Sequence, residues 1–377
     1  MHYLDNAATT KVDLQVADHI RKVMEQSFAN PSSLYKPGLD SELILRQSRA
    51  KVASAMGCTP AEVYFTGCGT ESNNIAILGA VEARKEWADY IICTGYEHPS
   101  VQQPIEKLQQ QGWKVTLVTP NEQGVIQPEQ LADLVTSKTA LVTAMQVNNE
   151  TGAILDVQKL SKLVKEKNAR TFVHVDGVQG WLRLPIKLSA TQIDSYAVSG
   201  HKIHAPKGIG ALYLKKNSNI IPPFLGGGQE KGIRPGTENL PYIAGLAMAA
   251  EMMQKNMPQR KKQIAHCNEL LRSQLENMDG IVLNSPQDAA PEVLNFSVMG
   301  IRSETMLHFL EQKEVYVSSG SACSKGAASH TLAAMGLPSQ RIDSALRVSF
   351  SKDSTQEDVQ ALLEGLAEGM ASLARVK

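Results

Sequence analysis

Short apolar runs alternate with longer stretches of helical periodicity from about residue 40 to residue 255. Continuous apolar runs are typical of strands covered on both faces, so the alternation predicts a mostly parallel sheet with helices on both sides. Residues 41–56 show the helical pattern, because their apolar positions recur on one side. The predicted strands of this part are 63–66, 90–93, 115–118, 140–145, 172–175, 196–198 and 211–214.

The pattern changes after residue 255, where longer helical stretches surround fewer strands. We predict helices at 260–278, 304–312 and 356–373, and strands at 281–283, 293–298 and 346–350. This order of helices and strands is typical of a smaller α+β domain. We therefore expect a large domain at 14–255 and a small domain made of 1–13 and 256–377.

Composition and charge narrow the class of protein. Hydrophobic residues make up 42% and charged residues 20%, as in ordinary folded soluble proteins. The 38 basic and 38 acidic residues cancel, so nucleic acid and anionic membranes are poor candidate partners. The chain shows neither a run of about 20 apolar residues nor the layout of a signal peptide.

The cysteines are five in number and scattered, without a Cys-x-x-Cys spacing. This argues against a disulfide framework and against a structural zinc site, and it favours a reducing compartment. We expect a cytoplasmic protein. The five are Cys58, Cys68, Cys93, Cys267 and Cys323.

Reactive side chains follow the predicted strands at the point where each strand ends. They are Thr70, His98, Asn149, Asp176 and Lys202. Ligands of open α/β sheets bind at this edge, so the sequence predicts a site there.

Lys202 and Asp176 point to an aldehyde cofactor. A lysine just past a buried strand can form a Schiff base, although the segment alone also fits a lysine in a surface loop. Asp176 closes a buried run and could pair with a protonated pyridine nitrogen, or else cap a helix. One helix-like connection and one strand separate the two residues, so both can face a single pocket.

Two further segments carry candidate binding groups. The turn Thr66-Gly67-Cys68-Gly69-Thr70-Glu71-Ser72 opens a helix and can bind an anion through free amides, or it is a plain turn. Arg347 lies in an alternating strand, on the face opposite its apolar neighbours. It is either a solvated arginine or a two-pronged donor for a carboxylate.

These segments occur together with several other motifs along the chain. They are Asp5-Asn6-Ala7-Ala8-Thr9-Thr10, Glu97-His98, Asn148-Asn149-Glu150, Arg234-Pro235-Gly236-Thr237-Glu238-Asn239 and Ser318-Ser319-Gly320-Ser321-Ala322-Cys323. As a set they resemble the cysteine desulfurases of the NifS/IscS type, from Tyr3 to about Leu373. The resemblance implies the aspartate-aminotransferase fold of pyridoxal 5'-phosphate (PLP) enzymes. The large domain would bind PLP and the small domain would carry the Cys323 loop.

The resemblance also implies roles around the cofactor ring. Lys202 would bind PLP covalently and later move the substrate's Cα proton. Asp176 would pair with the pyridine nitrogen, Gln179 would bond the ring hydroxyl, and His98 would stack on the ring and act as acid and base. Asn149 would contact both the cofactor and the substrate.

Other positions would hold the phosphate and the substrate. Arg347, with Asn149, would bind the carboxylate of the substrate L-cysteine. Thr237 would reach the phosphate from the second subunit of a homodimer. Within one subunit the phosphate would be held by Gly69, Thr70, Ser199 and His201.

Cys323 selects the reaction within this resemblance. A thiolate in a loop of Ser, Gly and Ala can attack the sulfur of bound cysteine and leave as a persulfide, with alanine as the other product. As a persulfide, Cys323 could also ligate an iron–sulfur cluster transiently. The sulfur would pass to an iron–sulfur scaffold, a tRNA-thiolation protein or another acceptor. We interpret Cys58, Cys93 and Cys267 as inert buried thiols.

The sequence departs from the family pattern at several positions. Gly67 and Cys68 replace a Ser-Gly pair in the phosphate turn. A positive φ at Cys68 would cost free energy, and the thiol is either a second reactive group or a small filler. Tyr35 and residues 180–185 also differ. The chain ends at Lys377 without an extended tail, which predicts weak docking to a general iron–sulfur scaffold and a more dedicated partner.

Three other functions remain open from the sequence. Selenocysteine lyase uses the same thiol and cofactor, so it is the nearest alternative. An aminotransferase or another PLP lyase would use the same fold without Cys323. An inactive interaction protein would not need the complete set of cofactor positions.

Overall fold

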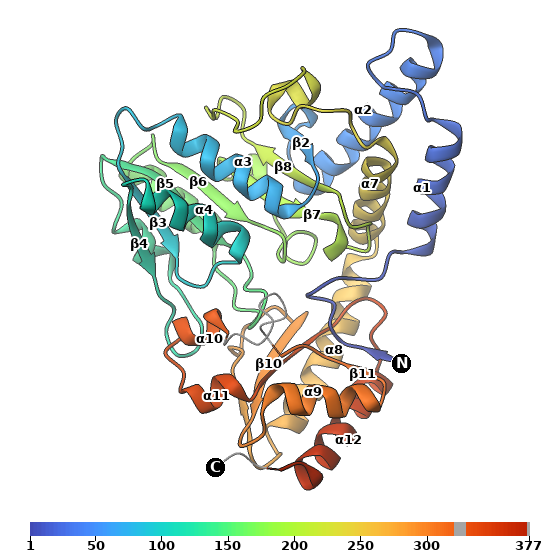
Figure 1. Ribbon diagram of the computed structural model, residues 1–377, viewed down its shortest axis with the longest axis vertical. Helices are drawn as coiled ribbons and strands as arrows, with labels where there is room; N and C mark the ends of the chain where they lie inside the picture. The colour runs from blue at the N-terminus through green and yellow to red at the C-terminus, as the bar shows by residue number, and fades with distance from the viewer. Residues whose placement is uncertain (320–328, 375–377) are drawn as a thin grey trace.

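The computed structural model describes residues 1–319 and 329–374, and its centre is a seven-stranded sheet in the order β2-β8-β7-β6-β5-β3-β4 (Figure 1). Strands β3 to β7 pair in parallel, whereas β8 is antiparallel to both β7 and β2. The predicted mostly parallel sheet is confirmed, and each predicted strand is present to within one residue at either end. The strands are β2 (Val63–Thr66), β3 (Tyr90–Thr94), β4 (Lys114–Val118), β5 (Thr139–Met145), β6 (Phe172–Asp176), β7 (Ser195–Ser199) and β8 (Gly210–Leu214).

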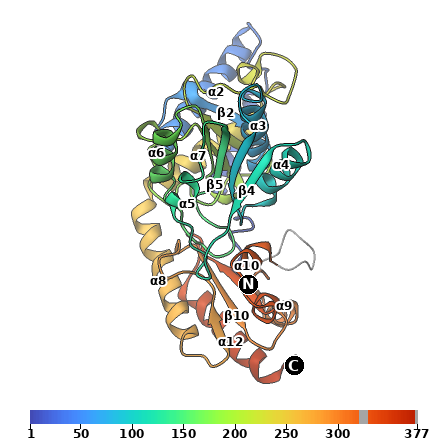
Figure 2. The same cartoon turned by 90° about the vertical axis from the view of Figure 1, so that its left-hand side faces the viewer.

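Helices cover both faces of this sheet, as the alternating sequence pattern predicts (Figures 1 and 2). Neighbouring residues of one strand enter different apolar clusters: Ile91 packs beneath α3 and α4, and Ile92 packs on the opposite side. This alternation follows from the two-residue period of a strand. The helices are α1 (Leu14–Gln26), α2 (Lys36–Met56), α3 (Gly69–Glu82), α4 (Pro99–Gln110), α5 (Pro128–Ala132), α6 (Val157–Lys167) and α7 (Leu240–Lys255).

Helix α2 shows how the local sequence sets helix ends. Pro37 stands in its first turn, where the missing amide hydrogen costs no intrahelical bond. Gly57 ends the helix in the left-handed conformation, with φ of 65°. A Cβ atom there would also lie 2.8 Å from the Cα atom of Lys187, so the position requires glycine.

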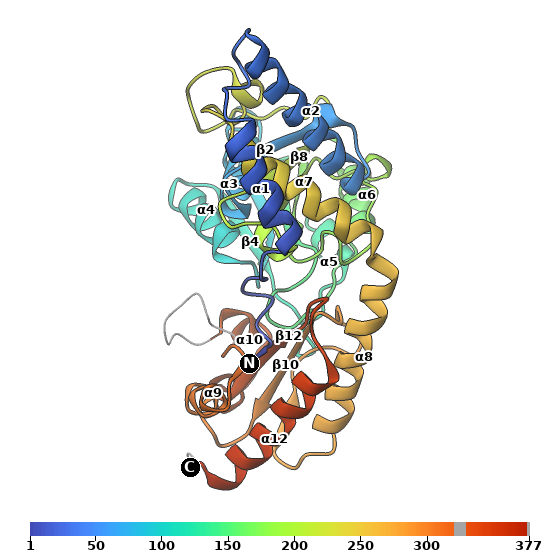
Figure 3. The same ribbon diagram turned by 90° about the vertical axis from the view of Figure 1, so that its right-hand side faces the viewer.

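A second body of structure follows α7, built on the antiparallel sheet β12-β10-β9 and the short pair β1-β11 (Figure 3). It has its own apolar cluster, including Leu294, Leu310 and Leu362. Its elements are β1 (His2–Tyr3), α8 (Met257–Leu275), β9 (Ile281–Leu283), β10 (Val293–Val298), α9 (Ser303–Gln312), β11 (Val315–Tyr316), α10 (His330–Ala334), α11 (Ser339–Asp343), β12 (Ala345–Ser349) and α12 (Gln356–Ser372). The division at residues 13 and 255 stays a prediction, which the separate cluster supports.

The first ten residues connect the two bodies. The Leu4 amide donates to the Tyr316 carbonyl at 2.9 Å, and the Ala7 amide donates to Ser349 Oγ at 2.8 Å. The Thr10 amide donates to the His201 carbonyl at 2.9 Å. This segment therefore lies between the end of β12 and the turn that carries Lys202.

None of the helices in the described part of the chain is both long enough and apolar enough to span a membrane.

Candidate active site

The predicted site residues lie at the carboxyl-terminal edge of the central sheet, where the loops of several strands meet. Asp176 is the last residue of β6, and Lys202 lies in the turn after β7. His98 caps α4 after β3, Gly69 opens α3 after β2, and Asn149 follows β5. The fold thus places residues that are far apart in sequence at one edge.

Lys202 extends its amine towards the N-terminal segment. Its Nζ atom donates to the carbonyl oxygens of Ala7 at 2.6 Å and Ala8 at 2.7 Å. Nε2 of Gln179 donates to the same Ala7 oxygen at 3.0 Å. The amine of Lys202 and the amide of Gln179 therefore lie close together, as one binding site requires.

Asp176 is a buried carboxylate held by a chain of neutral groups. Its two oxygens accept from Nδ2 of Asn73 and from the amide of Val178, both at 2.9 Å. Asn73 Oδ1 lies 3.0 Å from Nε2 of His174, whose Nδ1 lies 2.7 Å from the hydroxyl of Ser195.

Burial lowers the pKa of His174 to about 3, so its ring is neutral. Because Asn73 Oδ1 can only accept, the ring hydrogen lies on Nε2, and the Ser195 hydroxyl donates to Nδ1. Asp176 is only 4% exposed, yet it forms no ion pair within the described residues. A buried carboxylate in this condition suits a cationic ligand atom such as a pyridinium nitrogen.

The turn before α3 leaves an anion site. Cys68 precedes the helix without capping it through its side chain. The Ser199 hydroxyl is buried without a hydrogen-bond partner among the described residues. A Cβ atom on Gly69 would lie 2.7 Å from Cγ2 of Val178, so only glycine fits there. Free helix amides and an unpaired hydroxyl are groups that a phosphate can satisfy.

The steric penalty considered for Cys68 does not arise. Its φ is −175°, which is extended backbone that any residue adopts. The departure from the family pattern therefore leaves the turn unstrained at this position.

His201 directly precedes Lys202 in the chain and is the first of two histidines near the lysine. Burial, together with the positive charges of Lys202, Lys207 and His98, lowers the pKa of His201 to about 4. His201 Nδ1 lies 3.2 Å from the hydroxyl of Thr9. A bound anion would offset the excess of positive charge, which agrees with a phosphate at this end of the site.

His98 is held as a neutral base. Its Nδ1 accepts from the amide of Ser100 at 3.1 Å, so the neutral ring carries its hydrogen on Nε2. Burial lowers the pKa of His98, Asp176 opposes this shift and Lys202 adds to it. The charges of Asp176 and Lys202 therefore both act on the imidazole ring of His98.

Arg347 is buried, so the alternative of a solvated arginine is wrong. Only 3% of it is exposed. Nη1 donates to the Asn149 carbonyl at 3.0 Å and Nη2 to Oδ1 of Asp5 at 2.7 Å. Nε is buried without an acceptor among the described residues. Nε therefore has unused hydrogen-bonding capacity, and the binding of a substrate carboxylate by Arg347 stays a prediction.

The remaining predicted residues lie at the margins of the described site. Thr70 is exposed in the first turn of α3. Thr237 is exposed on the wall of a cavity of about 270 Å³ that Thr66 and Gly67 also line. Its contact with a second subunit stays a prediction. Cys323 lies outside the described residues.

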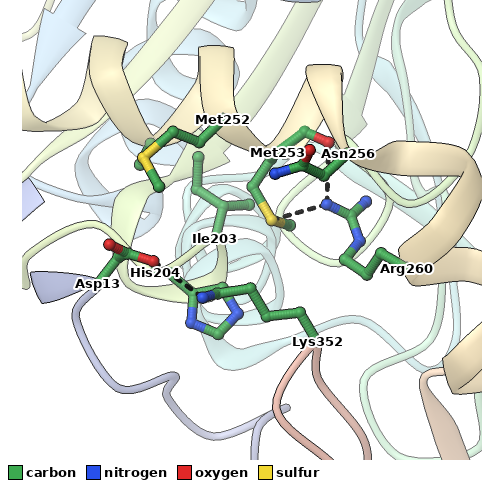
Figure 4. Close-up of a pocket in the computed structure, with 9 residues that line it drawn as sticks. Asp13, Ile203, His204, Met252, Met253, Asn256, Arg260 and Lys352 are labelled. Carbon is green, nitrogen blue, oxygen red and sulfur yellow. Dashed lines mark hydrogen bonds and ion pairs between the residues drawn. The ribbon is translucent and has the colours of Figure 1, made fainter. Parts of the chain in front are cut away.

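A hollow of about 60 Å³ lies beside Ile203 and His204, the two residues that follow Lys202 in the chain (Figure 4). Ile203 and His204 line it together with Met252 of α7, and the ion pair between Lys352 and Asp13 stands at its wall. None of the predicted site residues lines this hollow. It adjoins a smaller hollow lined by Lys202, with which it shares His204, Met253, Arg260 and Lys352.

Sequence reasoning missed several supporting residues. His174 and Asp176 lie two residues apart on β6 and therefore share a face, a signal that could have linked them. The contacts of Asn73 with both carry no such signal in the sequence.

The described part of the chain also holds no group of three His, Cys, Asp or Glu residues arranged to bind a metal.

Comparisons with known proteins show the family of the chain. Residues 2–362 match the family model described as aminotransferase class-V. The chain is 38% identical to a cysteine desulfurase of Trichormus azollae over 97% of this chain and 92% of that protein. It is 35% identical to the cysteine desulfurase IscS of Clostridium botulinum, over 97% of this chain and 93% of that protein.

The fold has a close structural relative as well. A solved structure described as a NifS-like protein superimposes with a TM-score of 0.93 at 35% identity, covering 98% of this chain and 99% of the other. The chain therefore belongs to the aminotransferase class-V family, among its members of the NifS/IscS type.

Proposed function

We propose that this protein is a PLP-dependent cysteine desulfurase, which converts L-cysteine into L-alanine and holds the sulfur as a persulfide on Cys323. One observation supports the binding of PLP. The buried Asp176 carboxylate has no ion-pair partner among the described residues and lies at the same sheet edge as Lys202. The cysteine desulfurases among the relatives support the reaction.

Four residues would hold the cofactor ring. Lys202 would bind it covalently, Asp176 would pair with its nitrogen, Gln179 would donate to its ring oxygen and His98 would stack on it. Bound PLP would supply an electron sink for the bonds of the substrate's α-carbon. The phosphate would lie against Gly69, Thr70, Ser199 and His201, and against Thr237 of a second subunit.

The side chains would then orient the substrate and move its protons. Arg347, with Asn149, would bind the substrate carboxylate and so present the Cα–H bond to the amine of Lys202. Nζ would take the Cα proton, and His98 would exchange protons at the substrate's amine and thiol. His98 suits this task because its ring is neutral in the folded protein.

Cys323 would complete the sulfur transfer. Its thiolate attacks the sulfur of bound cysteine, so a sulfur–sulfur bond forms and the carbon–sulfur bond breaks. The electron pair of the broken bond stays with the carbon fragment, which is protonated and leaves as alanine. The persulfide would then serve an acceptor protein in iron–sulfur, tRNA-thiolation or another sulfur pathway.

We further propose that the protein is a cytoplasmic homodimer. Large apolar side chains are exposed between α1 and α2 and in the segment before η4 (Gln229–Gly232), at the same end of the molecule (Figures 1 and 3). The most exposed are Phe28 at 82%, Leu34 at 91% and Leu225 at 97%. Apolar surface of this kind marks a protein contact, and a second copy would cover it.

Two variants separate the cofactor from the nucleophile. Lys202→Ala should lose the visible absorption of covalently bound PLP. Cys323→Ser should keep this absorption and still respond spectrally to cysteine, yet release neither alanine nor sulfide. Cys58→Ser is the matched control and should keep full activity. Normal turnover by Cys323→Ser would overturn the proposed mechanism.

Selenocysteine lyase is the nearest alternative, because the same groups serve both reactions. Comparison of kcat/KM for cysteine and selenocysteine would decide between them. Competition among candidate acceptor proteins for labelled sulfur would identify the pathway.

A further inference from the structure

Arg183 is a buried arginine that the proposed reaction does not yet use. It is 5% exposed and lies in the turns that follow β6. Its Nη1 donates to Oε1 of Gln179. Its Nη2 donates to the carbonyl oxygen of Lys202 at 3.4 Å. One guanidinium thus contacts both residues beside the cofactor position.

The turns after β6 bring Arg183 back over Gln179. The Trp181 amide donates to Gly177, and the Arg183 amide donates to Gly180 at 3.1 Å. Leu182 takes a positive φ of 61°, which reverses the chain just before the arginine. The backbone therefore fixes where the guanidinium lies.

The chemistry of the two side chains then fixes the amide of Gln179. A guanidinium has only donors, whereas the amide has an oxygen that accepts and a nitrogen that donates. With Oε1 facing Arg183, Nε2 must face the other way. There it donates to the Ala7 carbonyl at 3.0 Å, the same oxygen that Lys202 Nζ contacts. The donor end of Gln179 is thus turned towards the lysine.

The surroundings keep the guanidinium in place. Burial lowers the pKa of Arg183, but the carboxylate of Glu292 opposes this shift. Both side chains line a hollow of about 10 Å³ with Lys202 and Arg260. The hollow leaves Arg183 little room to turn away from Gln179.

We propose that Arg183 is a positioning residue that orients the Gln179 amide, so that Nε2 donates to the ring oxygen of bound PLP. This inference rests on the proposed function. The donated hydrogen bond draws negative charge on the ring oxygen away from the nitrogen that joins Lys202 to the cofactor. That nitrogen therefore releases its proton at a lower pH than it would without the oriented amide.

The test measures the pH midpoint at which the visible absorption band of the bound cofactor changes. In Arg183→Met the midpoint should rise by about one to two pH units, which corresponds to one charge-assisted hydrogen bond. Gln179→Leu should raise it by the same amount. Arg183→Lys, which still offers only donors, should restore much of the wild-type value.

The double variant distinguishes orientation from a simple charge effect. If Arg183 acts through Gln179, then Arg183→Met adds no further shift in the Gln179→Leu background. An equal added shift, or no shift in Arg183→Met alone, would overturn the proposal. Arg183→Gln, which can face the amide with either end, replaces Arg183→Met if that variant does not fold. Failure of the proposed function would show separately, as a wild-type protein without the cofactor band.

Discussion

Asp5 and Arg347 are 342 residues apart in the sequence and form an ion pair, in which Oδ1 of Asp5 lies 2.7 Å from Nη2 of Arg347. Nη1 of Arg347 donates a hydrogen bond to the carbonyl oxygen of Asn149 at 3.0 Å. These contacts fix the plane of the guanidinium and leave Nε without an acceptor among the described residues. The guanidinium of Arg347 is thereby held in one orientation, and its role in binding the substrate carboxylate stays a prediction.

Arg347→Lys should weaken cysteine binding although the charge is kept, because lysine loses the planar, two-pronged donor. A charge-assisted hydrogen bond contributes about 1.5–3 kcal/mol, so affinity should fall roughly ten- to a hundred-fold. Spectral titration with cysteine in the Cys323→Ser background measures this. The exposed Arg302→Lys is the matched control. Unchanged affinity in Arg347→Ala would show that the side chain only supports the fold.

Glu97 should make stability depend on pH in an unusual direction. Burial and the negative charge of Asp176 together raise its pKa from 4.5 to about 8. Between these values the folded state keeps a proton that the unfolded state has released. The free energy of unfolding should therefore fall as pH rises through this window, by at most about 1.4 kcal/mol per pH unit.

Glu97→Gln should remove that contribution, since glutamine resembles the protonated acid. Its amide oxygen can still accept from the Met145 amide, which lies 2.6 Å from Glu97 Oε1. Urea unfolding of the cofactor-free protein at pH 5, 6.5 and 8 would show a flatter profile than wild type. The exposed Glu106→Gln should leave the profile unchanged. Parallel profiles for Glu97→Gln and wild type would contradict the protonated state.

Gly177 lies so close to the ring of Tyr196 that any side chain there should lower the free energy of unfolding. A Cβ atom there would lie 1.9 Å from Cζ of Tyr196, whose hydroxyl donates to Gln146 at 2.5 Å. Overpacking of this kind costs about 1–3 kcal/mol, so Gly177→Ala should lower the free energy of unfolding by that order. Gly228→Ala is the control, because no atom would lie within 4 Å of its Cβ.

The partner residue gives the sharper test. In Tyr196→Val the same Gly177→Ala change should cost much less, so the two substitutions should be strongly non-additive. Fully additive losses in a double-mutant cycle would show that the backbone shifts away from the ring instead.

The strands could be predicted closely because a buried strand leaves a continuous apolar run. The run at residues 172–175 ends at Asp176, and β6 ends there as well. Helix α8 was predicted less well, beginning at Met257 and ending at Leu275 instead of spanning 260–278. Pro258 in its first turn marks the true start, since proline is favoured in the first turn of a helix.

The site was predictable as a set of residues but not as a set of contacts. Strand ends placed Asp176, His98 and Lys202 at one edge, because parallel strands share that edge. The burial of Arg347 and its bond to Asp5 depend on how the two sheets meet, which no local pattern contains. The bond from Arg183 to Gln179 depends on the positive φ of Leu182, a residue whose type does not favour it.

The cysteines should differ sharply in reactivity. The thiolate is the reactive form, and burial raises the pKa of Cys58 to about 12. At pH 8 fewer than about one in ten thousand such thiols is ionised. Burial also raises the pKa of Cys93 and Cys267, which are each 1% exposed. A brief treatment of the folded protein with iodoacetamide should therefore leave these three unmodified, and peptide mass spectrometry would check this.

Cys68 is the thiol whose role mass spectrometry after cysteine turnover decides. It is half-buried, has an unstrained backbone and makes no capping bond through its side chain to α3, so alanine should replace it without loss. After turnover of cysteine, mass spectrometry should find the persulfide on Cys323 and none on Cys68, and Cys68→Ala should keep full activity. Persulfide on Cys68, together with slower sulfur release by Cys68→Ala, would instead make it a second carrier. The Cys68→Ala variant tests the thiol and not the turn, because the extended backbone at this position needs no glycine and accepts a small side chain.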